Sequence, residues 1–333
     1  MTSRKYRPAW WVPGAHLHTL WGKFFPRGGG APTRVERWDT PDDDFLDIHR
    51  LDPPGAAPRA RPRLVVLHGL EGSPRSHYVR SFLYEATRRG WAADVVVFRS
   101  CGSELNRAPR FYHSGETSDL DFVVRSLTHS EPARPILLAG VSLGGNVLLK
   151  WLGENAGRVP PQVVAAAAVS VPFDLERGAR HIDRGFARVY QAHFLRTLRR
   201  KARGKLLRYP GLVDAAAVDR ARTLYDFDDV VTAPVHGFRD AHDYYSTSSA
   251  IGWIDRIRTP TLLLSARDDP FLPADVLDDV ARIAQGNSCL VTEFVERGGH
   301  VGFVSGSFPW KPFYFAEWRA TEFLASQLER QAA

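Results

Sequence analysis

The chain has 333 residues, an ordinary apolar share of 44% and a net charge of +7 that is carried mainly by arginine. This length is enough for one large α/β domain with an insertion or for two smaller domains, and nothing in the composition suggests a disordered chain. The positive charge comes with no motif typical of DNA or RNA binding, so we predict no nucleic-acid partner.

Cysteine usage and the first residues bear on where the protein works. Cys101 and Cys289 are too few for a disulfide framework or a tetrahedral zinc site, and they suit a reducing compartment. The aromatic-rich segment Ala9–Phe25 is interrupted by proline, glycine, histidine and lysine, unlike a signal peptide or a membrane span. We therefore predict a cytoplasmic protein in which residues 1–32 form an arm that packs on the core. The alternative is that the aromatic side chains of this arm enter a membrane interface.

The first two strands are expected to form an antiparallel hairpin. Beyond the glycine run at residues 28–30, Thr33–Trp38 and Phe45–Leu51 have strand patterns on either side of a turn-rich segment. Three consecutive acids, Asp42–Asp44, lie in that turn, but the spacing of an EF-hand is missing, and a solvated turn is the better interpretation. A Pro/Ala/Arg linker, Pro53–Pro62, follows the hairpin.

Most of the remaining chain alternates apolar strand patterns with helical ones. This alternation predicts a mostly parallel, doubly wound sheet with right-handed crossovers. The predicted helices include His77–Arg89, which Gly90 ends, and a closing helix, Trp310–Leu328. The predicted strands are Arg63–Leu67, Ala93–Phe98, Ile136–Ala139, Val163–Val171, Thr261–Ser265 and Cys289–Val295.

The pattern changes over residues 172–250, where no core strand interrupts the helical periodicity. Ile182–Leu207 and Ala215–Phe227 are the clearest helical segments. We therefore predict a helical cap over residues 172–250, inserted into a core formed by residues 33–171 and 251–333.

This cap is strongly basic and contains several aromatic residues. Its cations are expected to form a solvated helix face, and a surface that recruits anionic lipid or an acyl carrier is the alternative. Its aromatic side chains either line a pocket for an acyl chain or pack within the cap. The cations are Arg196, Arg199, Arg200, Lys201, Arg203 and Lys205, and the aromatics are Phe186, Tyr190, Phe194, Tyr244 and Tyr245.

The main functional signal lies in Pro135–Lys150. An apolar strand leads into Gly140-Val141-Ser142-Leu143-Gly144, and helical periodicity follows. A serine at the apex of such a turn is typical of a nucleophile, because the two glycines let strand and helix approach closely and the helix N-terminus favours negative charge. Judged from the motif alone, the alternative is a serine that caps a helix.

A second loop is expected to complete an oxyanion hole. His68-Gly69-Leu70-Glu71-Gly72 follows the strand Arg63–Leu67, and its glycines let the backbone approach a substrate. Acyl transfer needs a backbone N–H from this loop opposite the one that follows the nucleophile. We expect Leu70 and Leu143 to supply these N–H groups. A simple glycine-rich turn between strand and helix is the alternative.

A nucleophilic serine also needs a histidine to remove its proton and a carboxylate to orient that histidine. His300 lies between glycines near the end of the chain, and Asp268 and Asp269 follow the strand Thr261–Ser265. The chain order Ser142, aspartate, His300 is that of the α/β-hydrolase fold. The distance from the strand favours Asp269 as the acid. Asp268 stays open for that role, and either aspartate could instead cap a helix or brace the loop.

Two other reactive side chains are given no catalytic role. Cys101 lies in a polar loop, and no motif places a histidine beside it, so we interpret it as a packing residue. His113 lies in a loop that could face the pocket, and a structural hydrogen bond is at least as good an interpretation.

Several longer motifs together resemble the YheT-like branch of the α/β-hydrolases, and the resemblance runs nearly end to end. It implies a serine hydrolase with carboxylesterase-type activity, and relatives in animals act on lipid esters. The motifs that carry it are His16–Leu20, His68–Gly72, Tyr112–Gly115, Ser142–Asn146, Asp226–Tyr245 and Asp268–Phe271.

The residues and the resemblance together predict a soluble ester hydrolase without a cofactor. In it Ser142 attacks an acyl carbonyl, His300 moves the proton and Asp269 orients His300. Two alternatives stay open: the natural substrate is a thioester or a phospholipid, or the chain is a non-catalytic binding protein on a hydrolase scaffold. A metal enzyme is the least favoured class, because H-E-x-x-H and closely spaced Cys/His ligands are missing from the sequence.

Overall fold

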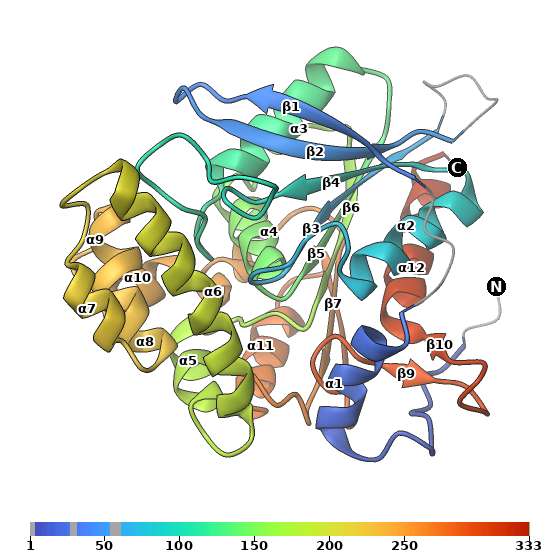
Figure 1. The fold of residues 1–333 in the computed structure, drawn as a ribbon. Helices are drawn as coiled ribbons and strands as arrows, with labels where there is room; N and C mark the ends of the chain where they lie inside the picture. Colours follow the sequence, from blue (N-terminus) through green and yellow to red (C-terminus); the bar gives the residue numbers. More distant parts are fainter. Residues whose placement is uncertain (1–3, 27–31, 54–60, 333) are drawn as a thin grey trace.

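An eight-stranded sheet runs through the molecule in the order β1-β2-β4-β3-β5-β6-β7-β8 (Figure 1). The computed structural model describes residues 4–26, 32–53 and 61–332, so the glycine run at 28–30 and most of the Pro53–Pro62 linker lie outside the described residues. β3 to β8 pair in parallel, whereas β2 pairs antiparallel with both β1 and β4. The prediction of a mostly parallel sheet with an antiparallel N-terminal hairpin is therefore confirmed. The strands are β1 (Arg34–Asp39), β2 (Phe45–Leu51), β3 (Arg63–Leu67), β4 (Ala92–Val97), β5 (Ile136–Val141), β6 (Val163–Val169), β7 (Thr261–Ala266) and β8 (Leu290–Val295).

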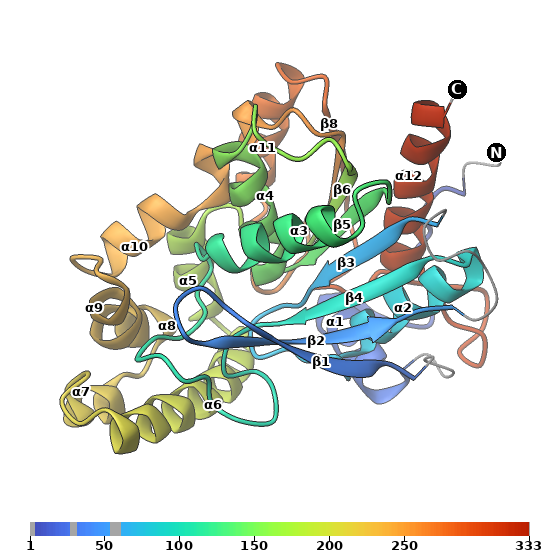
Figure 2. The same ribbon diagram turned by 90° about the horizontal axis from the view of Figure 1, so that it is seen from above.

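Helices cover both faces of this sheet and build two hydrophobic cores. Because successive residues of a strand point to opposite faces, Val65 and Leu67 enter one core while Leu64 and Val66 enter the other. Figure 2 shows the strands fanning out between α3 and α4 on one side and α2 and α12 on the other. The first core receives α3 (Ser118–Ser130), α4 (Leu143–Glu154) and α11 (Asp275–Gln285), and the second receives α2 (His77–Arg89) and α12 (Phe315–Ala332).

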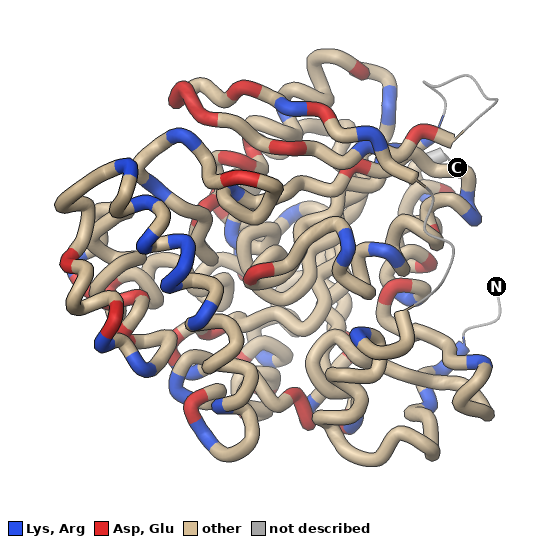
Figure 3. The backbone as a smooth tube through the Cα atoms, in the orientation of Figure 1, with Lys and Arg blue, Asp and Glu red and all other residues tan. Residues whose placement is uncertain are grey.

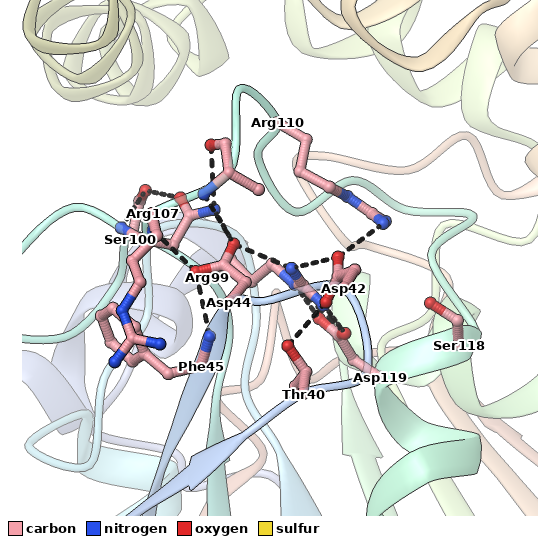
Figure 4. A network of polar contacts seen from close by, with 12 residues as sticks. Thr40, Asp42, Asp44, Phe45, Arg99, Ser100, Arg107, Arg110, Ser118 and Asp119 are labelled. Atoms are coloured by element: carbon pink, nitrogen blue, oxygen red, sulfur yellow. Dashed lines mark hydrogen bonds and ion pairs between the residues drawn. The ribbon is translucent and has the colours of Figure 1, made fainter. Parts of the chain in front are cut away.

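The turn between β1 and β2 differs from the solvated turn that we expected. Asp44 is completely buried and accepts hydrogen bonds from the side chains of Arg99 and Asn106 and from three backbone amides (Figure 4). Arg99 is buried as well and also pairs with Asp42 and Asp119. The expectation was wrong for Asp44, because the cation that pairs with it comes from the loop after β4, far along the chain, whereas Asp42 and Asp43 are exposed.

A run of helices connects β6 to β7 and lies beside the sheet (Figure 1). These helices form hydrophobic clusters of their own, one around Leu195 and Phe227 and one around Tyr244 and Tyr245. They are α5 (Leu175–Ile182), α6 (Ala187–Arg208), α7 (Ala215–Arg220), α8 (Leu224–Phe227), a π-helical turn (Asp228–Thr232), α9 (Ala233–His236) and α10 (Ala241–Ser248), followed by 3-10 turns at Ala250–Gly252 and Ile254–Arg256.

Two helical segments of this region are divided where periodicity predicted continuous helices. The segment Ile182–Leu207 contains a break before α6, because Gly185 has a φ of 52° and leaves the helical conformation. The segment Ala215–Phe227 is divided by Thr223, which begins α8 with a capping box that includes Asp226.

The last part of the chain also differs from the prediction. The closing helix begins at Phe315 and not at Trp310, because Pro312 disfavours helical backbone at the residue before it. The two residues of β10 (Phe313–Tyr314) instead pair antiparallel with β9 (Val304–Ser305).

The N-terminal arm contains a helix, α1 (Gly14–Phe24), that the sequence patterns did not identify. It contacts both α2 and β9, so residues from the two ends of the chain lie together (Figure 1). Across residues 4–26, 32–53 and 61–332, no helix has both the length and the apolar character that crossing a bilayer requires.

Candidate active site

Ser142 stands at a sharp turn between β5 and α4. Its backbone has a φ of 53° and a ψ of −122°, which is a strained conformation for a residue with a side chain. The two glycines of the motif permit this turn. A Cβ on Gly140 would lie 2.5 Å from the carbonyl oxygen of Gly144, and one on Gly144 would lie 2.5 Å from that of His68.

Three loops at the carboxyl ends of strands bring a serine, a histidine and an aspartate into contact. His300 Nε2 lies 3.0 Å from Ser142 Oγ, and His300 Nδ1 lies 2.8 Å from Asp269 Oδ2. A neutral imidazole that donates from Nδ1 to the carboxylate leaves Nε2 able to accept the serine proton. The ring of Phe271 stacks on His300, with the centroids 4.2 Å apart. The arrangement can therefore hold a nucleophile, a base and an acid in series.

The two neighbouring aspartates have different partners. Asp269 is almost completely buried, and its Oδ1 accepts from the N–H of Phe271 at 2.8 Å while Oδ2 faces His300. Asp268 Oδ1 accepts instead from the N–H groups of Gly298 and Gly299, at 2.8 and 2.9 Å. Asp269 is therefore the carboxylate that faces His300, and Asp268 braces the loop that carries the histidine.

The backbone of that loop is strained. Val301 and Phe303 have φ values of 59° and 40°, which residues with side chains rarely adopt. Such a conformation persists only where the surroundings hold it. One restraint is Ser170, directly after β6, whose Oγ accepts from the Val301 N–H at 3.0 Å.

The N-terminal arm supplies a further restraint. Thr19 Oγ1 accepts from the His300 N–H at 2.9 Å and donates to the Ala15 carbonyl at 2.8 Å. His18 is buried, and its Nδ1 accepts from the Val304 N–H at 3.2 Å. A Cβ on Gly299 would lie 2.4 Å from the Ala15 oxygen, so helix and loop are in direct contact. Sequence reasoning missed this role of the arm, although the motif His16–Leu20 marked the segment.

Leu70 and Leu143 both lie in the wall of the cavity beside Ser142. Leu143 begins α4, so its N–H is among those that have no partner inside the helix. The loop around Leu70 is fixed by two tyrosine hydroxyls that accept the neighbouring N–H groups. These bonds run from Gly69 N to Tyr78 Oη at 2.9 Å and from Glu71 N to Tyr112 Oη at 2.8 Å.

His68 fixes the start of the same loop. Its Nδ1 donates to the Gly69 carbonyl at 2.8 Å, and its Nε2 accepts from the Phe98 N–H at 3.2 Å. Complete burial lowers the pKa of His68 to about 4, so the imidazole is neutral at pH 7.

A cavity of about 570 Å³ extends from Ser142 and His300 between the core and the α5–α10 region. A mostly apolar wall next to a nucleophile suits an acyl chain. Of the five aromatics named from the sequence, Phe186 is exposed and the other four line the cavity. The apolar wall includes Leu175, Ala179, Ile182, Tyr190, Phe194, Leu198 and Phe271.

One carboxylate lies in this wall. Asp228, in the π-helical turn, accepts hydrogen bonds from Thr232 Oγ1 at 2.5 Å and from Tyr245 Oη at 2.7 Å. Burial raises the pKa of Asp228 to about 6, and the two hydrogen bonds oppose that rise.

The basic run of α6 is only partly the solvated face that we expected. Lys205 is completely buried and donates to the carbonyls of Asn106 and Ala108. Lys201 pairs with Glu71 at 2.5 Å and so joins α6 to the loop that holds Leu70. The expectation was wrong for these two lysines because a helical pattern in the sequence does not show which side chains of the helix will contact the core.

His113 and Cys101 have structural surroundings. His113 lines the cavity, and its Nδ1 accepts from the Gly115 N–H at 3.1 Å. Burial, followed by the nearby His236 and Arg110, lowers the pKa of His113 well below its usual value. Cys101 packs on the first core, and burial raises its pKa to about 11, so it is a poor nucleophile.

Comparisons with known proteins agree with this architecture. Residues 62–307 match the model of the alpha/beta hydrolase fold family. The chain is 38% identical over 99% of its length to the candidate esterase YheT of Escherichia coli (strain K12), covering 96% of that protein. It is 33% identical over 76% of its length to a monoacylglycerol lipase of Saccharomyces cerevisiae, covering 57% of it, and 27% identical over 93% to Phospholipase ABHD3 of Mus musculus, covering 75% of it.

Among solved structures, the Pyrococcus furiosus esterase Pf2001 superposes with a TM-score of 0.58 at 17% identity, over 91% of this chain and 96% of the esterase. That likeness bears on the fold alone. The family match and the relatives identify the chain as a hydrolase that belongs to the YheT-like branch of the α/β-hydrolase fold family.

Proposed function

We propose that the chain hydrolyses carboxylic esters through an acyl-enzyme on Ser142. The observation that carries this proposal is the unbroken series of contacts from Ser142 Oγ through His300 to Asp269. In this proposal residues 172–250 act as a cap over the site, residues 33–171 and 251–333 as the catalytic core and residues 1–32 as the arm.

Acylation begins when Ser142 Oγ attacks the ester carbonyl and its proton passes to His300 Nε2. The imidazolium that forms is stabilised by the Asp269 carboxylate, which keeps its negative charge. The N–H groups of Leu70 and Leu143 donate to the oxyanion of the tetrahedral intermediate. His300 then gives the proton to the leaving alkoxide, and the alcohol departs.

Deacylation repeats these steps with water as the nucleophile. His300 takes a proton from the water, the hydroxide attacks the acyl carbonyl, and the proton returns to Ser142 Oγ as the carboxylic acid leaves. The balance is one ester and one water for one acid and one alcohol, and no step needs a cofactor.

The cavity supports an acyl chain as the part of the substrate that the cap region binds. Its wall from α5 and α6 is aliphatic and aromatic, and two relatives carry the names of a lipase and a phospholipase. A series of p-nitrophenyl esters from acetate to palmitate tests this. We expect kcat/KM to rise with chain length until the cavity is filled.

The decisive experiment compares wild type with Ser142→Ala on p-nitrophenyl butyrate. Loss of the nucleophile should lower kcat by at least about 10³-fold. Ser130→Ala, at the end of α3, is the matched control and should keep full activity. Equal turnover by wild type and Ser142→Ala would refute the proposal.

A fluorophosphonate probe separates an enzyme from a binding protein on the same scaffold. The probe forms a stable bond only with an activated serine, so folded wild type and Ser130→Ala should label at Ser142 while Ser142→Ala should not. Folded wild type that stays unlabelled would favour the non-catalytic alternative.

A further inference from the structure

Large apolar side chains are exposed on three neighbouring segments at one side of the cavity. Trp10 is 78% exposed and Trp310 is 73% exposed, so most of the surface of each indole is in contact with solvent. Monomeric proteins rarely leave several large aromatic rings in water without a partner. The aromatic rim consists of Trp10, Leu17, Phe24, Phe25, Phe186, Val189, Phe308 and Trp310.

Contacts join the β9–β10 loop to the arm and link the parts of the arm to each other. Phe308 stacks on Trp310 with the centroids 5.0 Å apart, and Trp10 Nε1 donates to the Ser307 carbonyl at 3.0 Å. From there a chain of ring contacts crosses the arm to α1. It runs from Trp11 to Trp21 at 4.8 Å and from Trp21 to Phe25 at 4.5 Å.

The rim also borders the route to the nucleophile. His16 of α1 contacts Phe186, at a centroid distance of 4.7 Å, and Tyr190 of α6. Tyr190 then contacts Phe271, which stacks on His300. Thr19, Leu20 and Lys23 of α1 line the same cavity. An apolar surface therefore leads from the rim to the catalytic histidine.

The charge on the arm and on the β9–β10 segment has one sign. Residues 1–35 include Arg4, Lys5, Arg7 and Lys23 and contain no aspartate or glutamate. Residues 297–316, which carry the β9–β10 loop, include Arg297 and Lys311 and no acid either. Figure 3 shows the segment from the N-terminus through α1 with basic positions and no acidic one.

We propose that the aromatic rim docks on an anionic phospholipid bilayer. Indole rings favour the boundary between headgroups and acyl chains, and nearby cations are attracted to anionic headgroups. Docking there would place the cavity mouth at the membrane surface, so that an acyl substrate enters from the lipid. The docking surface is inferred from the exposed rings and the positive charge. Only the entry of substrate from the lipid rests on the proposed function.

The test is co-sedimentation with two kinds of phosphatidylcholine vesicles, one without anionic lipid and one that contains about 30% phosphatidylglycerol. We expect wild type to bind the anionic vesicles, to bind neutral ones more weakly, and to be released by salt. The double variant Trp10→Ser/Trp310→Ser should lose about tenfold or more of its affinity for the anionic vesicles, because two indole rings can no longer enter the lipid. Leu207→Ser, which removes an 88% exposed side chain at the far end of α6, is the matched control and should bind like wild type.

Two readouts keep this result separate from the proposed function. Turnover of soluble p-nitrophenyl butyrate should be unchanged in the double variant, and Ser142→Ala should still bind vesicles. Wild type that does not sediment with anionic vesicles would overturn the inference, whatever Ser142→Ala does to turnover. A rim-dependent dimer in sedimentation velocity, without vesicle binding, would also overturn it and would assign the rim to a second copy of the chain.

Discussion

His300 is positioned by side chains from distant parts of the chain, and Thr19 is the least expected of them. Its hydroxyl accepts from the His300 N–H and donates to the Ala15 carbonyl, so it holds the histidine backbone on α1. In the proposed mechanism His300 is the base, and a small displacement of it would be costly because proton transfer depends on its alignment with Ser142.

We expect Thr19→Val to lower kcat about tenfold on p-nitrophenyl butyrate with little change in KM, because valine keeps the shape of threonine but cannot accept a hydrogen bond. Thr19→Ser should restore kcat, since it returns the hydroxyl. A rise in KM at constant kcat would show instead that Thr19 acts only as part of the cavity wall.

The raised pKa of Asp228 predicts how the stability of the protein depends on pH. Its pKa is raised to about 6 in the folded protein, above the usual value of an aspartate in an unfolded chain. The folded protein therefore binds this proton more tightly, and the associated stability is present at low pH and lost as the pH rises towards about 6. The variant Asp228→Asn cannot titrate at this position. We expect the free energy of unfolding of Asp228→Asn, measured relative to that of wild type, to increase as the pH rises from about 4 to about 6 and to stay constant above that range.

Urea unfolding of both proteins at several pH values measures this difference. A stability difference that is independent of pH would contradict the assignment of the titration to Asp228. Thr232 and Tyr245 donate to different oxygens of Asp228, and asparagine can accept only one of these two hydrogen bonds. That loss does not depend on pH, so the pH dependence of the stability difference reports the proton on Asp228.

At the scale of elements, the turn between β1 and β2 is joined to the loop after β4 and to α3 by the Arg99 network (Figure 4). Burial raises the pKa of Asp44, but hydrogen bonds from Asn106 and from the amides of Arg107 and Ala108 outweigh it and lower that pKa below its usual value. The network therefore keeps Asp44 charged inside the protein.

We expect Asp44→Asn to reduce the free energy of unfolding by about 3 kcal/mol, because it removes a buried charge that faces Arg99. Asp43→Asn is the matched control. Asp43 is exposed with a φ of 57°, which asparagine also adopts, so its change should stay within about 0.5 kcal/mol. Urea denaturation measures both, and equal losses would contradict a specific role for the network.

Elements with a strong pattern were predicted well, and those set by distant contacts were not. The helix His77–Arg89 was predicted with its observed bounds, since its periodicity is clear and Gly90 supplies the left-handed end. The helix α1 was missed because its glycine, histidine and lysine residues suggested an interrupted segment, although Leu17, Leu20, Trp21 and Phe24 have helical spacing. Its location depends on contacts with the loop around His300, which lies at the other end of the chain.

For the whole molecule, the fold class and the three side chains that meet at the site could be named from the sequence. Motifs and chain order carry that information, because each loop follows a strand whose carboxyl end lies at the same edge of the sheet. The choice between Asp268 and Asp269 needed the structure. Both follow β7 directly, and only the three-dimensional arrangement shows which carboxylate faces His300 and which one faces the glycine amides.

The contact between Thr19 and His300 spans 281 residues. Synthesis runs from the N-terminus to the C-terminus, so α1 cannot contact its loop until residue 300 has been synthesised. We therefore expect nascent chains that stop before residue 300 to be silent towards active-site probes. Competence for turnover would then arise only once α1 and the loop around His300 have met.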